Sequence, residues 1–140
     1  MEKNNINKLL SIIFVTGAIV LSLELLASRI LLPFFGSSIY IWTSILSVTL
    51  IFLAFGYQLG GWITSKVNSN YYEELFIFIP FVSAIFILIS TLAYPILLPY
   101  LLNFNMLAGC FIGSSLLLAI PLILMSSLNP ILISIIKSKN

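Results

Sequence analysis

The chain has 140 residues, of which 61% are hydrophobic and only 7% are charged, and its formal net charge is +2. A soluble domain typically carries about 25% charged residues, so this composition does not provide a surface that faces water. The sequence therefore predicts an integral membrane protein, and the small net charge, spread over membrane flanks, indicates no nucleic-acid partner.

Four apolar stretches follow one another, at residues 9–32, 38–63, 75–102 and 106–136. A helix needs about 20 apolar residues to cross a hydrocarbon core of roughly 30 Å. Transmembrane strands would alternate apolar and polar residues, whereas these runs are continuous. We expect an all-α bundle of four transmembrane helices, forming one domain over 9–136 between a short segment (1–8) and a tail (137–140).

The first predicted helix carries Glu24 and Arg29, the latter being the only arginine of the chain. Its apolar run exceeds the roughly 7–15 residues of a signal-peptide core, which indicates a retained helix. At 1.5 Å per residue Glu24 lies roughly 22 Å from Leu9, inside the hydrocarbon. Arg29 lies near the far edge, where its long stem can reach the interface. Five residues correspond to about 140° around a helix, which argues against an ion pair between the two.

Glu24 shares one helix face with Gly17, Leu21 and Ser28, and we expect this face to turn inward with Ser28 as a hydrogen-bond donor. Ionisable residues inside membranes usually face the bundle interior and mark ligand or proton pathways. Three interpretations remain open for Glu24. It is a structural carboxyl group that is protonated or bonded internally, a carboxylate facing a cationic or amine ligand, or a carboxylate that couples transport to protons.

Small residues in the later helices predict close helix contacts. Gly56–Gly60 and Gly109–Gly113 both have the G-x-x-x-G spacing that lets helix backbones approach. Cys110 is the only cysteine, and the chain has no histidine, so the sequence predicts no disulfide, metal site or cofactor.

Prolines inside the third and fourth helices, including Pro121 and Pro130, predict kinks because each removes a backbone hydrogen bond. Ser126, Ser127 and Asn129 directly precede Pro130. These side chains either satisfy the freed backbone groups or line a polar cavity.

Lysines set the expected orientation. The N-terminal segment, the polar loop at 64–74 and the C-terminal tail would share one side of the membrane, and they hold Lys3, Lys8, Lys66, Lys137 and Lys139. Since positive charge accumulates on the cytoplasmic side, we expect both termini in the cytoplasm and the protein in the inner (plasma) membrane.

Three segments resemble the membrane portion of spermidine synthase-like membrane proteins, often called fused major-facilitator/spermidine synthase proteins. They are GAIVLSLELLASRILLPFFGSSIYIW, FGYQLGGWITSK and PLILMSSLNP. The matching residues are Gly17, Glu24, Arg29, Pro33, Gly36, Ser37, Ser38 and Trp42, then Gly56, Tyr57, Gly60 and Gly61, and finally Pro121, Leu124, Met125 and Pro130. The chain departs from the family at Ser126–Ser127, where Gly-Ala is usual, and after Trp62, where the family favours an arginine-bearing segment.

The resemblance implies the membrane half of such a protein without its synthase domain. Fused members continue into a cytoplasmic aminopropyltransferase-like domain, whereas this chain has no aspartate and no glycine-rich nucleotide loop, so we expect no enzyme activity. The implied function is to anchor, or exchange a polyamine with, a separately encoded synthase-like partner. The candidate substrate-binding residues are Glu24, Ser28, Arg29, Trp42 and Tyr57. Pro33, Gly36 and Ser37 are expected to form the turn after the first helix, and the residues expected at helix contacts are Gly17, Gly56, Gly60, Gly61, Gly109, Gly113, Pro121 and Pro130.

Two other functions stay open. The first is a small proton-coupled exporter of amines or drugs that acts as a homo-oligomer, since small multidrug transporters are also four-helix chains with one essential glutamate. The second is a non-catalytic scaffold or the remnant of a longer protein. In each case the lipid bilayer is the surrounding partner.

Overall fold

The computed structural model describes residues 3–36, 39–68 and 71–139. It contains α1 (Lys3–Phe35), α2 (Ile39–Lys66), α3 (Tyr72–Leu101) and α4 (Met106–Lys139). All four helices are long and apolar enough to cross a membrane, and the described ranges contain no strand. The prediction of an all-α bundle with four membrane-spanning helices is confirmed.

The helices extend beyond the predicted apolar runs. Helix α1 begins at Lys3 rather than at residue 9, and α4 continues to Lys139 rather than ending at 136. The predicted polar loop at 64–74 is also shorter, because α2 continues to Lys66 and α3 begins at Tyr72. The Tyr72 hydroxyl donates to the Thr64 carbonyl at 2.7 Å and so connects the two helices. An apolar run marks only the part of a helix inside hydrocarbon, whereas the backbone hydrogen bonds continue into polar residues outside it.

The end of α1 corrects the predicted Pro33–Gly36 turn. Pro33 lies inside the helix, and the chain turns at Gly36, whose φ is +72°. The Gly36 N–H donates to the Leu32 carbonyl at 2.9 Å, which closes the last turn. This left-handed conformation favours glycine, which has no Cβ to clash. Ser37, predicted in the same turn, lies outside the described residues.

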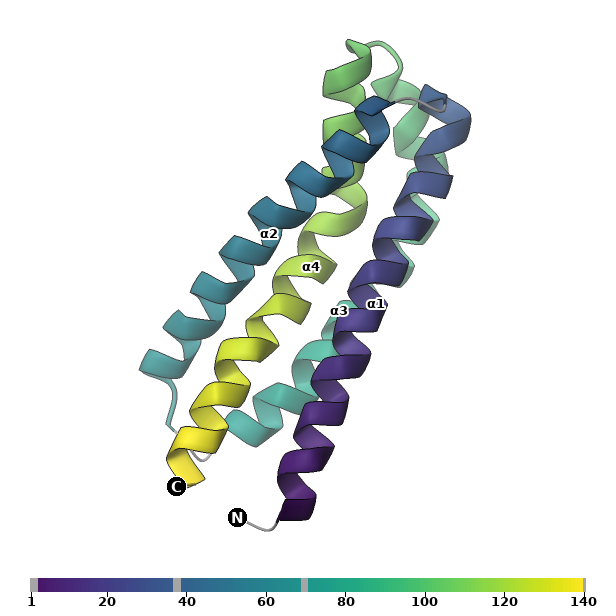
Figure 1. Ribbon diagram of the computed structural model, residues 1–140. Coiled ribbons are helices and arrows are strands. Elements are labelled where there is room, and N and C mark those ends of the chain that lie inside the picture. The colour runs from purple at the N-terminus through teal and green to yellow at the C-terminus, as the bar shows by residue number, and fades with distance from the viewer. Residues whose placement is uncertain (1–2, 37–38, 69–70, 140) are drawn as a thin grey trace.

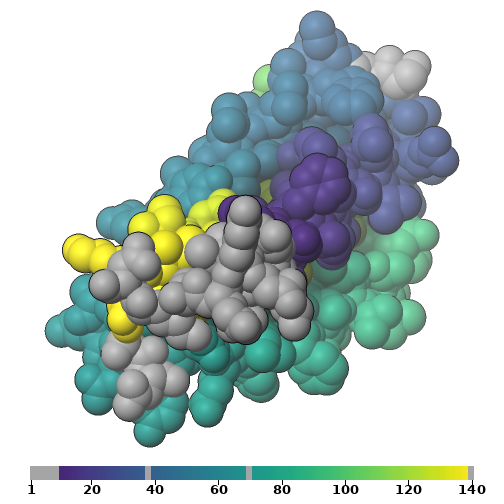
Figure 2. Space-filling model, turned by 60° about the horizontal axis from the view of Figure 1, so that its bottom comes forward, coloured from purple at the N-terminus to yellow at the C-terminus, as the bar shows by residue number. Residues whose placement is uncertain are grey.

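The helices run alternately up and down, so α1 begins at the end of the bundle where α4 finishes (Figure 1). Helix α4 lies centrally and packs against α1, α2 and α3. In the most apolar stretch of α4, 44% of the residues are buried within the chain, compared with 11% for α1. Figure 2 views this terminal end, where the last turns of α4 (yellow) lie between α2 and α3.

The α2–α4 contact depends on two glycines of α2. A Cβ added to Gly56 would lie 2.5 Å from the Ile123 carbonyl oxygen, and one added to Gly60 would lie 2.5 Å from the Ser127 carbonyl oxygen. Such distances are shorter than packed carbon and oxygen atoms allow, so only glycine permits this approach of the two backbones.

The second glycine pair lies where α4 meets α1 and α3. A Cβ at Gly109 would lie 2.6 Å from the Phe35 ring, and one at Gly113 would lie 2.9 Å from Leu31 Cδ2. Two other glycines expected at helix contacts are not there. A Cβ at Gly17 or Gly61 would meet no atom within 4 Å, because Gly17 borders open space between α1, α2 and α4 and Gly61 is exposed.

The buried apolar residues form two cores that differ in the helices they join. The core near the α1–α2 turn combines all four helices and includes Leu31, Ile45, Leu98 and Leu118. The buried residues of the core near the chain termini come only from α3 and α4, for example Phe76 on α3 and Ile131 on α4. Helices α1 and α2 therefore pack tightly at one end and separate toward the other (Figure 1).

Replacing Gly56 by leucine should lower the free energy of unfolding by about 1–3 kcal/mol, because the side chain would be forced against the α4 backbone. Unfolding with sodium dodecyl sulfate in mixed micelles, followed by circular dichroism, measures the change. Gly61→Leu is the matched control, since that position on the same helix is open. Equal losses for the two variants would show that the α2–α4 approach does not need glycine.

Candidate functional site

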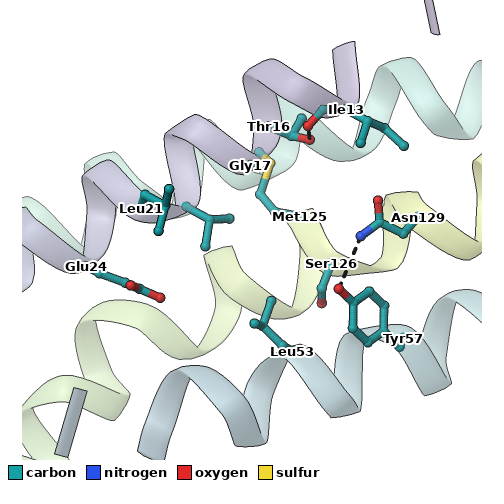
Figure 3. A pocket seen from close by; sticks show the side chains of 11 residues that line it. Ile13, Thr16, Gly17, Leu21, Glu24, Leu53, Tyr57, Met125, Ser126 and Asn129 are labelled. Atoms are coloured by element: carbon teal, nitrogen blue, oxygen red, sulfur yellow. Dashed lines mark hydrogen bonds between the residues drawn. The ribbon is translucent and has the colours of Figure 1, made fainter. Parts of the chain in front are cut away.

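A cavity of about 270 Å³ lies between α1, α2 and α4. It occupies the half of the bundle in which α1 and α2 are separated, and α4 lies between these two helices there (Figure 3). The lining residues are Ile13, Thr16, Gly17, Val20, Leu21 and Glu24 of α1, Leu53 and Tyr57 of α2, and Met125, Ser126 and Asn129 of α4.

Glu24 is the only ionisable carboxyl group among these lining residues. Its side chain is half-buried and points from α1 toward the cavity (Figure 3). Within the described ranges it makes no hydrogen bond and no ion pair. It lies eleven residues before Phe35 at the end of α1, which is roughly 16 Å along the axis and inside a hydrocarbon core of about 30 Å.

A polar group of side chains lies farther along the cavity. Asn129 Nδ2 on α4 donates to the Tyr57 hydroxyl oxygen on α2 at 3.3 Å (Figure 3). The hydroxyl groups of Thr16 and Ser126 donate to the carbonyl oxygens three residues earlier in their own helices, at 2.8 and 3.2 Å. Because these hydroxyl protons are engaged, the Tyr57–Asn129 pair offers the most available polar atoms at this end of the cavity.

The structure brings together some of the predicted site residues and separates others. Glu24 and Tyr57 line the same cavity. Ser28, expected to donate to Glu24, donates instead to the Leu25 carbonyl at 2.7 Å, because a serine in a helix can bond its own preceding turn. Arg29 and Trp42 are exposed and do not line the cavity, and their assignment to substrate binding stays a prediction.

The residues before Pro130 combine the two roles that the sequence left open. Ser127 donates to the Leu124 carbonyl at 2.7 Å, so its hydroxyl forms a hydrogen bond with the backbone of its own helix. Ser126 and Asn129 line the cavity. Thr16 was not predicted from the sequence as a cavity residue. Its spacing could have indicated it, because Thr16 lies eight residues, or about two helical turns, before Glu24 on the same helix.

Glu24 is the only His, Cys, Asp or Glu side chain among the residues that line the cavity. Among the residues that the structure describes, no three His, Cys, Asp or Glu side chains lie together. Cys110 is buried in the core near the α1–α2 turn, away from the cavity. Chemically, the site is an apolar pocket with one carboxylate and one hydroxyl–amide pair.

No protein-family model, curated protein or solved structure matches this chain. The assignment of a function therefore depends on the chemistry of the cavity.

Removing the Tyr57 hydroxyl should lower the free energy of unfolding by about 1 kcal/mol, the typical net value of one hydrogen bond, since Asn129 loses its acceptor across α2 and α4. Tyr57→Phe is compared with Tyr40→Phe, which deletes an exposed hydroxyl that has no hydrogen-bond partner in the described ranges. Micellar unfolding curves give both values, and indistinguishable curves would contradict a structural role for the Asn129–Tyr57 bond.

Proposed function

We propose that this chain is a multipass membrane module that binds a cationic amine in the cavity, with the Glu24 carboxylate as the counter-ion. The observation that carries the proposal is the lack of any partner for Glu24 within the described ranges, although it lies at hydrocarbon depth. A charge near a helix centre costs about 2.5–3.5 kcal/mol on insertion scales, and this cost is offset when a cation binds beside it.

The alternative structural role for Glu24 fits less well. A protonated carboxyl group that held two helices together would donate its O–H to an acceptor on a neighbouring helix. No such bond is present among the described residues. The side chain instead points into an open cavity, as a ligand-binding group would.

We further propose that the module anchors a polyamine-synthase-like protein on the cytoplasmic side of the membrane. Lys66 at the end of α2 and Lys137 near the end of α4 support a cytoplasmic location for this end of the bundle. Any aminopropyl transfer would take place on the partner.

The test compares amine binding by purified protein with binding by its Glu24→Gln variant. Loss of the carboxylate should weaken binding roughly tenfold or more, the value of one charge-assisted hydrogen bond, as measured by isothermal titration calorimetry with octylamine. Glu74→Gln is the matched control, because it removes the same charge from the exposed first turn of α3.

A second variant keeps the charge and removes the space. Gly17→Leu places a side chain in the cavity, and its Cβ would have no other atom within 4 Å. It should weaken amine binding while the protein remains as stable as the wild type. Unchanged binding in both Glu24→Gln and Gly17→Leu would rule out this cavity as the site.

A proton-coupled exporter is the second candidate, favoured by the same membrane-embedded carboxylate. The two functions differ in what amine binding releases. An exporter should give up a proton from Glu24 when the amine binds, and reconstituted vesicles should accumulate amine when a pH gradient is applied. For the proposed module we expect binding without gradient-driven accumulation.

A further inference from the structure

We infer that the cavity selects a ligand with one ammonium group, an apolar body and a neutral polar group at its far end, in preference to an amine with two or more ammonium groups. This inference rests on the proposed function, because it narrows the ligand class of the same Glu24 site. Three properties of the lining carry it: its charge, its apolar middle, and the position of its hydroxyl–amide pair.

The lining balances one positive charge. Glu24 is the only acidic residue that lines the cavity, and Glu73 and Glu74 belong to the first turn of α3, a helix that contributes no residue to the lining. Burying an ammonium group that has no counter-charge is strongly unfavourable, even where neutral oxygens surround it. A second ammonium group on the ligand would therefore have to remain outside or be bound at a large cost.

The middle of the cavity is apolar. Between Glu24 and the polar end the lining consists of aliphatic and thioether side chains, among them Val20, Leu21, Leu53 and Met125. A chain of methylene groups would gain about 0.8 kcal/mol for each group removed from water there. This favours a ligand whose body is hydrocarbon over one that carries a charged nitrogen in its middle.

The far end of the cavity suits an uncharged polar group. The Tyr57–Asn129 pair supplies a phenol hydroxyl and an amide, so it can both donate to and accept from a ligand hydroxyl. Figure 3 shows Glu24 at one end and this pair toward the other, at the level of Thr16. Thr16 and Glu24 are eight residues apart, or about 12 Å along α1, which is comparable with the span from the nitrogen to the oxygen of an extended 8-amino-1-octanol.

The rim of the cavity is consistent with a ligand that dissolves in the bilayer. Leu21 on α1 is 63% exposed and Tyr57 on α2 is 47% exposed, so the opening lies on the apolar flank of the bundle. The hydrocarbon part of an amphiphilic amine partitions into the bilayer, so the amine can reach the opening from the lipid. A molecule with several charges stays in water and has no such path.

Three amines of equal chain length test the inference: octylamine, 8-amino-1-octanol and 1,8-diaminooctane. They differ only in carrying a methyl, a hydroxyl or a second ammonium group at the far end. Each is titrated against wild-type protein in nanodiscs, and the signal from Glu24→Gln nanodiscs is subtracted to remove partitioning into lipid. We expect 8-amino-1-octanol to bind most tightly, and 1,8-diaminooctane to bind at least about tenfold more weakly, the penalty of one poorly compensated buried charge.

Tyr57→Phe provides a second readout. It should bring the affinity for 8-amino-1-octanol down to about that for octylamine, since only the alcohol uses the far-end pair. A fall in the affinity for both amines would show that Tyr57 shapes the cavity and does not recognise the ligand's far end, and this would overturn that part of the inference.

The outcomes separate this inference from the proposed function. If 1,8-diaminooctane binds as tightly as 8-amino-1-octanol and its binding still requires Glu24, single-charge selection is wrong and amine binding stands. If none of the three amines shows binding that depends on Glu24, the proposed function itself is wrong.

Discussion

The packing of α2 against α4 through Gly56 and Gly60 is the contact on which the arrangement of this bundle depends. In a bilayer, apolar side chains gain little by leaving lipid for protein, so helices associate where their backbones come close enough for dense van der Waals contact. The two glycines of α2 meet carbonyl oxygens of α4 directly. Helix α4 thereby becomes the centre of the fold, and α1 and α3 add to its remaining faces through Gly109, Gly113 and the two apolar cores.

The cavity is a consequence of this arrangement. Helix α1 is tied to the other helices mainly near Leu31 and Phe35, where one core joins all four helices. Toward the chain termini, the fully buried core residues come from α3 and α4, and α1 adds only the partly buried Ile13 and Val20. Helices α1 and α2 are thus free to separate over α4, and the space between them receives Glu24. A carboxyl group that would be costly against lipid thereby acquires a half-enclosed site between three helices.

Much of the fold followed from local chemistry. Continuous apolar runs predicted the four helices, and G-x-x-x-G spacing pointed to the backbone contacts at Gly56 and Gly60, because both features need only neighbouring residues to be recognised. The role of Pro33 was wrong, since a proline near a helix end is compatible with helix or turn, and Gly36 alone carries the positive φ. Ser28 was expected to donate to Glu24 because the two residues share a helix face, but its hydroxyl bonds the preceding turn of its own helix. Tyr57, which the resemblance included, and Asn129 line the same cavity from other helices, and their position depends on how far α1 and α2 separate.

The central position of α4 also has a consequence for biosynthesis. Helix α4 is the last of the four in sequence, yet it supplies the surface against which each of the others packs. Helices α1, α2 and α3 insert into the bilayer during translation before that surface exists. Until α4 leaves the translocon they have few contacts with one another, so Glu24 and the α2 glycines face lipid or the insertion machinery. Assembly of this bundle therefore waits until α4 has been synthesised and inserted, and a nascent chain arrested before α4 would be a ready substrate for membrane quality control.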